Sequence, residues 1–189
     1  MIGFILLGFI GLLGLAFATS AVHHKIRLAK EKGSFIPIGQ IVDVDGHNMH
    51  VYQEGHGKET LVFMSGNGTS SPVLDFKSLF SQVSDQYKVV VVEKQGYGFS
   101  DITDSPRDMQ TMLSQTRKAL AEAGLQGPFI LVPHSASGLE ALYWAQNYPE
   151  EVRAVIGLDI AVPASYQDFK INIPLFRFAS FLADMGITR

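Results

Sequence analysis

The chain begins with a long run of apolar residues. Residues 1–22 contain no ionisable side chain, and His23, His24 and Lys25 follow them directly. As a helix this run would be about 33 Å long, which is enough to cross the hydrocarbon core of a bilayer. We therefore expect a single transmembrane anchor over residues 1–22.

Two alternatives compete with the anchor. The triplet Ala16-Phe17-Ala18 resembles the cleavage site of a signal peptide, but the basic segment that should precede the apolar run is missing. A buried core helix is the second alternative. It is disfavoured because glycine is a poor helix former, and the run contains Gly3, Gly8, Gly11 and Gly14.

The charges beside the run predict its orientation. Four basic side chains follow it and none precedes it: Lys25, Arg27, Lys30 and Lys32. The positive-inside rule then places the C-terminal side in the cytoplasm, with an extracytoplasmic or secreted location as the alternative. Residues 23–38 are expected to form a juxtamembrane linker, in which Gly33, Ser34 and Pro37 break the helix.

A β-hairpin is predicted next. Asp45-Gly46 is a two-residue hairpin turn between the extended segments 41–44 and 47–53. Four side chains would supply the apolar positions of this antiparallel pair: Ile41, Val42, Met49 and Val51.

Short apolar runs then alternate with helical patterns. We expect buried strands at residues 60–64, 87–92, 129–132 and 155–158, and helices at residues 73–83, 109–123 and 138–148. The second helix would be capped from Asp104 or Ser105, with Gly124 just past its end. This alternation predicts an α/β fold with a mostly parallel, doubly wound sheet, entered through the antiparallel hairpin.

The pattern changes over residues 164–189. Ile171, Leu175, Phe176, Phe178 and Phe181 belong to an apolar, aromatic-rich stretch that does not continue the alternation. We interpret it as the start of a cap or lid region over a pocket. The alternatives are an ordinary core helix and a region whose packing partner is absent.

Composition narrows the function classes. Charged residues make up 17% of the 189, and hydrophobic residues make up 47%, which excludes intrinsic disorder. The absence of cysteine excludes a disulfide framework, a thiolate zinc site and a cysteine nucleophile. Beyond residue 35 the chain carries 11 basic and 17 acidic groups without a basic cluster, so nucleic-acid binding is not expected.

The turn after the third buried strand carries a candidate nucleophile. Ser135 stands between that strand and a helix, where a tight turn would expose its Oγ. Ser137 is a poorer candidate, because Leu139 would occupy a position that needs a small residue.

Three blocks resemble the α/β-hydrolase fold family. Residues 131–141 (LVPHSASGLEA) are similar to its nucleophile elbow, usually G-H-S-x-G-G, with Pro133 and Ser137 at the two glycine positions. Residues 61–68 (LVFMSGNG) resemble its oxyanion-hole strand and loop, where His-Gly is usual. Residues 91–101 (VVEKQGYGFSD) resemble its D-x-x-G-x-G-x-S segment, with Glu93 in place of aspartate. The resemblance covers residues 39–163.

The resemblance implies a role for each residue. Ser135 would attack an acyl carbonyl, and the backbone N–H groups of Asn67 and Ala136 would hold the oxyanion. Three residues would support the elbow: His134, Ser137 and Gly138. Asp159 is a candidate for the catalytic acid, and neither a cofactor nor a metal is implied.

The catalytic base is not identified, because no histidine follows His134. We therefore expect a membrane-anchored serine hydrolase of carboxylesterase, lipase or peptidase type, acting on an ester or amide of a small-molecule or lipid-like acyl group. The 189 residues would be its N-terminal part, inactive without the catalytic histidine.

A non-catalytic, membrane-anchored binding protein and a cofactor-free haloperoxidase are the alternatives. A haloalkane dehalogenase is disfavoured because that chemistry uses an aspartate at the elbow. Oligomeric state is not predicted.

Overall fold

The computed structural model describes residues 2–166 and 172–188. The chain divides into two compact units. One unit is Pro37–Asp168, and the other combines Met1–Ile36 with Phe169–Arg189.

The N-terminal segment is one continuous helix, α1 (Ile2–Lys32). An 18-residue stretch within Gly3–Glu31 has a mean hydropathy of 2.2, and none of its residues is buried. This part of the chain therefore has a helix long and apolar enough to cross a membrane, a property that a signal sequence shares.

The helix continues past residue 22 and ends before Gly33, so most of the segment expected to be a linker is helical. Lys, Arg, Leu and Ala dominate residues 25–32, and these are strong helix formers. Arg27 and Glu31 also form an i, i+4 ion pair at 3.9 Å.

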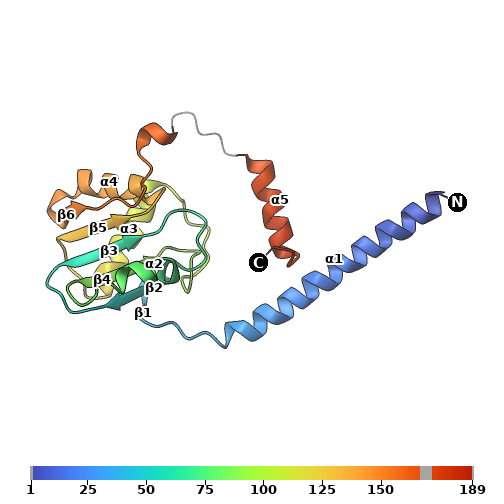
Figure 1. The fold of residues 1–189 in the computed structure, drawn as a ribbon, viewed down its shortest axis with the longest axis horizontal. Helices are drawn as coiled ribbons and strands as arrows, with labels where there is room; N and C mark the ends of the chain where they lie inside the picture. The colour runs from blue at the N-terminus through green and yellow to red at the C-terminus, as the bar shows by residue number, and fades with distance from the viewer. Residues whose placement is uncertain (1, 167–171, 189) are drawn as a thin grey trace. The chain divides into compact units, whose positions relative to one another are not determined.

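A six-stranded sheet forms the centre of the other unit, in the order β1-β2-β4-β3-β5-β6 (Figure 1). Its strands are β1 (Gln40–Val44), β2 (His47–Glu54), β3 (Thr60–Met64), β4 (Lys88–Glu93), β5 (Phe129–Pro133) and β6 (Val152–Val155). β2 is antiparallel to both β1 and β4, and the remaining pairs are parallel. The mostly parallel sheet entered through a hairpin is confirmed.

The hairpin turn has the expected geometry. Asp45 and Gly46 have φ of 56° and 83°, as a two-residue turn with a left-handed backbone requires. Ile41 is 44% exposed, contrary to its expected place among the packed positions, because strand side chains alternate between faces. The buried residues of the hairpin are Val42, Val44, Met49, His50, Val51 and Tyr52.

Helices cover both faces of the sheet. On one face, Phe76 and Phe80 of α2 (Pro72–Phe80) pack with Phe63 and Val91. On the other, α3 (Met109–Glu122) and α4 (Ser137–Asn147) pack with strand residues, burying Leu113, Leu120, Ala141 and Trp144. Since both faces are covered, the central strands β3, β4 and β5 are almost continuously apolar, whereas β6 includes Arg153 and none of its residues is buried.

Helix α3 begins at Met109, as expected, but a different residue caps it. Its N-cap is Asp108, not Asp104 or Ser105, and the Asp108 carboxylate accepts the backbone N–H of Thr111 at 2.9 Å. The segment before it stays non-helical, with the Arg107 guanidinium donating to the carbonyl oxygen of Gln95 at 2.6 Å. Gly124, with φ of 75°, follows the end of the helix as expected.

The last strand also differs from its expected bounds of 155–158. β6 starts at Val152, after the short 3-10 helix η1 (Pro149–Glu151). Past its end the chain stays bonded to β5, because the Ile156 and Leu158 N–H groups donate to Leu131 and Pro133 carbonyls, both at 2.8 Å. The apolar run 155–158 is therefore an irregular continuation of a strand that begins earlier.

The expected cap region contains η2 (Pro163–Tyr166) and α5 (Ile173–Asp184). Asn172 caps α5 by accepting the N–H of Leu175 at 3.1 Å. No residue of α5 is buried, contrary to an ordinary core helix. Residues 167–171 of this region, including Ile171, lie outside the described residues, as does Met1 of the expected anchor.

Candidate active site

The turn between β5 and α4 is strained at Ser135. This residue has φ of 53°, the left-handed region that a non-glycine residue enters at a cost of about 1–3 kcal/mol. Neighbouring backbone holds it there: Ser135 N–H donates to Leu158 O at 3.4 Å, and its carbonyl accepts from Ala161 N–H at 2.9 Å. The side chain is half-buried and stands ahead of the first turn of α4. This is the geometry expected of a nucleophile elbow.

Close backbone approaches explain the small residues around the turn. A Cβ atom on Gly66 would lie 2.9 Å from the Ser135 Cβ. A Cβ atom on Gly138 would lie 2.5 Å from the carbonyl oxygen of Ala161. Gly138, one position later than the usual motif glycine, therefore occupies a site where a larger residue does not fit.

Ser137 stabilises the elbow from inside. It is 2% exposed, its Oγ donates to the Met64 carbonyl at 2.6 Å, and the same Oγ accepts the His134 N–H at 2.9 Å. These bonds tie the elbow to the end of β3. Ser137 is thus placed as a structural serine, away from the pocket.

A pocket of about 500 Å³ opens beside Ser135. The loop after β3 forms one wall, and the elbow and the start of α2 form the others. Its lining residues are Ser65, Gly66, Asn67, Gly68, Thr69, Asp75, Phe76, His134 and Ser135. Of these, Asn67, His134 and Ser135 are the sequence-based candidates for the site, and the others were not predicted.

Asn67 lines this pocket, and Ala136 directly follows Ser135 in the elbow. In residues 2–166 and 172–188, neither Asn67 N–H nor Ala136 N–H donates to a protein acceptor. Ala136 is the N-cap of α4, where the helix dipole favours negative charge. Tyr97 supports the loop by accepting the Gly68 N–H at 3.4 Å, and Thr69 donates to the Asp75 carboxylate.

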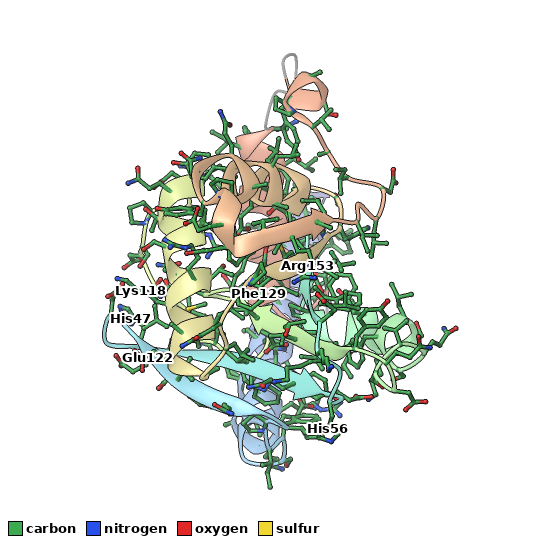
Figure 2. All side chains as sticks on the ribbon, turned by 90° about the vertical axis from the view of Figure 1, so that its left-hand side faces the viewer. His47, His56, Lys118, Glu122, Phe129 and Arg153 are labelled. Carbon is green, nitrogen blue, oxygen red and sulfur yellow. The ribbon has the colours of Figure 1, made fainter. Side chains whose placement is uncertain are left out.

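No histidine in the described part of the chain hydrogen-bonds to Ser135 Oγ. His134 is exposed, with its ring edge on Phe76 at 6.4 Å between centroids. His50 is buried, with Nδ1 3.0 Å from a Glu93 oxygen and Nε2 3.0 Å from the Ile38 carbonyl. His47 and His56 lie near opposite ends of β2 (Figure 2).

Asp159 lies just past Leu158, whose carbonyl accepts from Ser135, and has φ of 48°. Its side chain is exposed and is not part of the pocket lining. Within the described ranges its carboxylate has no hydrogen-bond or ion-pair partner. The structure thus brings Ser135, Asn67, Ala136 and His134 together, and leaves Asp159 without a catalytic partner.

Buried charges near the site were missed by the sequence reasoning. Lys94 and Glu140 are 8% and 0% exposed and form an ion pair. Glu93 is also fully buried, and one of its oxygens accepts from both His50 Nδ1 and Phe99 N–H. The available signal was a pair of charges, Glu93-Lys94, directly continuing the apolar run of β4.

Metal ligands do not gather at this site. Among the residues that the structure describes, no group of three or more His, Cys, Asp or Glu side chains is arranged to hold a metal ion.

Comparisons with known proteins agree with this geometry. The family model described as alpha/beta hydrolase fold matches residues 59–181. Protein YbdG of Bacillus subtilis, described as uncharacterized, is 48% identical over 151 residues, which are 80% of this chain and 46% of YbdG. The 2-(acetamidomethylene)succinate hydrolase of Mesorhizobium japonicum is 27% identical over 122 residues, 65% of this chain and 42% of that enzyme. The chain therefore spans less than half the length of each of these relatives.

Solved structures show the same fold. An epoxide hydrolase from Bacillus megaterium superposes with a TM-score of 0.60 at 20% identity, covering 76% of this chain and 50% of that one. The likeness at this identity concerns the fold alone.

Proposed function

Because this chain belongs to the α/β hydrolase fold family, we propose that it carries the nucleophile and the oxyanion-binding groups of a serine hydrolase acting on an ester or amide. One observation carries the proposal. Ser135 has a left-handed backbone between β5 and α4, beside a pocket that the Asn67 loop also lines. A serine in such a turn presents its Oγ to a substrate at the helix N-terminus.

The reaction is acyl transfer through Ser135. Its Oγ forms a bond to the carbonyl carbon while its proton passes to a base, and the carbonyl oxygen gains the negative charge. The N–H groups of Asn67 and Ala136 would stabilise this oxyanion, and a donor of this kind contributes about 3–4 kcal/mol. Collapse of the intermediate breaks the bond to the leaving alcohol or amine, which takes the proton. Water then releases the acid from the acyl-enzyme by the same steps.

The base is the part that the described residues do not supply. Without one, a serine hydroxyl is a weak nucleophile. We propose that the histidine lies in sequence beyond these 189 residues, in keeping with the 46% of YbdG that the chain covers. Asp159 remains a candidate acid, because its backbone adjoins the elbow.

The pocket and α1 bear on the type of substrate and on the side of the membrane where it binds. Small-molecule or lipid-like acyl groups fit a pocket of about 500 Å³ whose lining includes Phe76. We place α1 in a membrane as a single anchor, with the hydrolase unit on the cytoplasmic side because the basic residues follow the apolar run.

A fluorophosphonate probe tests the nucleophile. The 189-residue chain and the complete product of its reading frame are each treated with the probe, and labelled peptides are identified by mass spectrometry. We expect Ser135 to be labelled rapidly in a protein that includes the base and slowly in the 189-residue chain. Ser135→Ala should abolish the label, whereas Ser78→Ala, at an exposed serine of α2, should not change it.

The alternative is a non-catalytic, membrane-anchored binding protein with the same fold. It is favoured by the lack of a histidine bonded to Ser135 in the described residues. Absence of labelling in both proteins, while both remain folded, would support it against the hydrolase.

A further inference from the structure

Lys94 is a buried cation at the junction of three elements. It follows the last residue of β4 and is 8% exposed. Its Nζ donates to the carbonyl oxygen of Ser65 at 3.3 Å and forms an ion pair with the carboxylate of Glu140 on α4. Glu140 also accepts the hydroxyl of Thr116, on α3, at 3.1 Å.

Stability alone is a weak reason to bury such a pair. Removing two charges from water is expensive, and apolar residues of similar volume often replace a buried ion pair with no loss of stability. What the pair does supply is a defined geometry, because a buried ammonium must keep its acceptors close.

The pair joins the two elements that present the oxyanion donors. Ser65 begins the loop that includes Asn67, and its neighbour Gly66 contacts Ser135. Glu140 is on α4, whose N-cap is Ala136. Lys94 therefore connects the loop of one donor to the helix of the other.

We propose that Lys94 and Glu140 are positioning residues that fix the spacing of the Asn67 and Ala136 N–H groups. The inference rests on the proposed function for the role of those N–H groups, and on the observed contacts for the connection between them. Neither side chain lines the pocket or touches the reacting atoms.

The test compares single and double substitutions. Lys94→Met leaves the Glu140 carboxylate buried without its cation, so the chain should unfold at a lower temperature. The double variant K94M/E140L replaces both charges with apolar groups and should unfold at or above the wild-type midpoint. K118M, which breaks the exposed Lys118–Asp45 pair, is the control.

Two measurements are made on the full chain in detergent micelles. Hydrogen exchange of a peptide covering residues 61–69 reports the order of the Ser65–Asn67 backbone, and we expect faster exchange in K94M/E140L. Probe labelling of Ser135 at several probe concentrations should show a maximal rate lowered about tenfold or more, with the probe's half-saturating concentration little changed. A general loss of folding would not separate the two parameters in this way.

The outcomes are distinguishable. Unchanged exchange in the stable double variant, or wild-type labelling rates, would overturn the positioning role. Absence of labelling in every protein, including the complete reading-frame product, would refute the proposed function. In that case the exchange measurement still decides whether Lys94 and Glu140 order the loop.

Discussion

Gly66 and Ser135 approach each other so closely that no side chain fits between them. A Cβ atom on Gly66 would lie 2.9 Å from the Cβ of Ser135 and 3.1 Å from the carbonyl oxygen of His134. The loop after β3 and the elbow after β5 therefore share one packed contact, and the geometry of each depends on the other.

Substitution Gly66→Ala tests this contact. The added methyl group must displace either the loop or the elbow, which should lower the free energy of unfolding by about 1–3 kcal/mol. Labelling of Ser135 should fall by about 10-fold to 100-fold, because small displacements of catalytic groups have effects of that size. Gly33→Ala, at a glycine with open space around it, is the control. If Gly66→Ala and Gly33→Ala had the same free energy of unfolding and the same labelling of Ser135, the contact between Gly66 and Ser135 would not be important.

The buried His50–Glu93 pair predicts an effect on the stability of the fold. Replacing His50 with leucine removes one of two hydrogen-bond donors to a fully buried carboxylate. We expect the free energy of unfolding to fall by about 1–3 kcal/mol, the usual effect of leaving a buried acceptor without its hydrogen-bond donor. Denaturant titration measures it. His47→Leu, at an exposed histidine of the same strand, should change stability much less, and a similar loss in both would contradict the prediction.

The contacts between Tyr52, Glu54 and Lys77 predict a dependence of stability on pH. The hydroxyl of Tyr52, followed by the ammonium of Lys77, lowers the pKa of Glu54 from its ordinary value to about 2. Since the pKa is lower in the folded protein, this carboxylate adds stability that is complete above pH 4.5 and is lost as the pH falls toward 2. Tyr52→Phe keeps the packed ring and removes the largest cause, so the folded-state pKa should rise toward the ordinary value. NMR titration of the Glu54 carboxyl measures it. An unchanged pKa in Tyr52→Phe would show that the hydroxyl is not the cause.

The membrane proposal for α1 is tested by fractionation. The full chain should stay with membranes after an alkaline carbonate wash, whereas Leu12→Arg with Leu13→Arg should release it. A charged side chain at the centre of a span costs about 2.5–3.5 kcal/mol on the insertion scale. Leu28→Arg, beyond the uncharged run, is the control and should have little effect.

Protease added to intact cells tests the orientation. The hydrolase unit should be digested only after the cells are permeabilised. Digestion from outside would reverse the orientation, and a mature chain that lacks residues 1–18 would identify the segment as a signal peptide.

Local signals explain the accuracy of the sequence predictions. Asp45-Gly46 specifies a left-handed turn, and apolar runs such as Val89–Val92 specify strands covered on both faces, because both depend on neighbouring residues alone. Ser135 is proposed as the nucleophile on the same kind of signal, a serine between an apolar run and a helical pattern. Errors occurred where competing local signals stood close together, as with Asp104, Ser105 and Asp108 before α3.

By itself, the sequence therefore determined the apolar N-terminal helix, the α/β alternation and the position of the candidate nucleophile. Only the tertiary structure decided the strand order, the contact of Gly66 with Ser135, and the partners of the buried charges. His50 and Glu93 are 43 residues apart, and Lys94 meets Ser65 and Glu140 only because parallel strands end at one edge of the sheet. No local pattern encodes such pairings, since each depends on how crossover connections bring distant segments together.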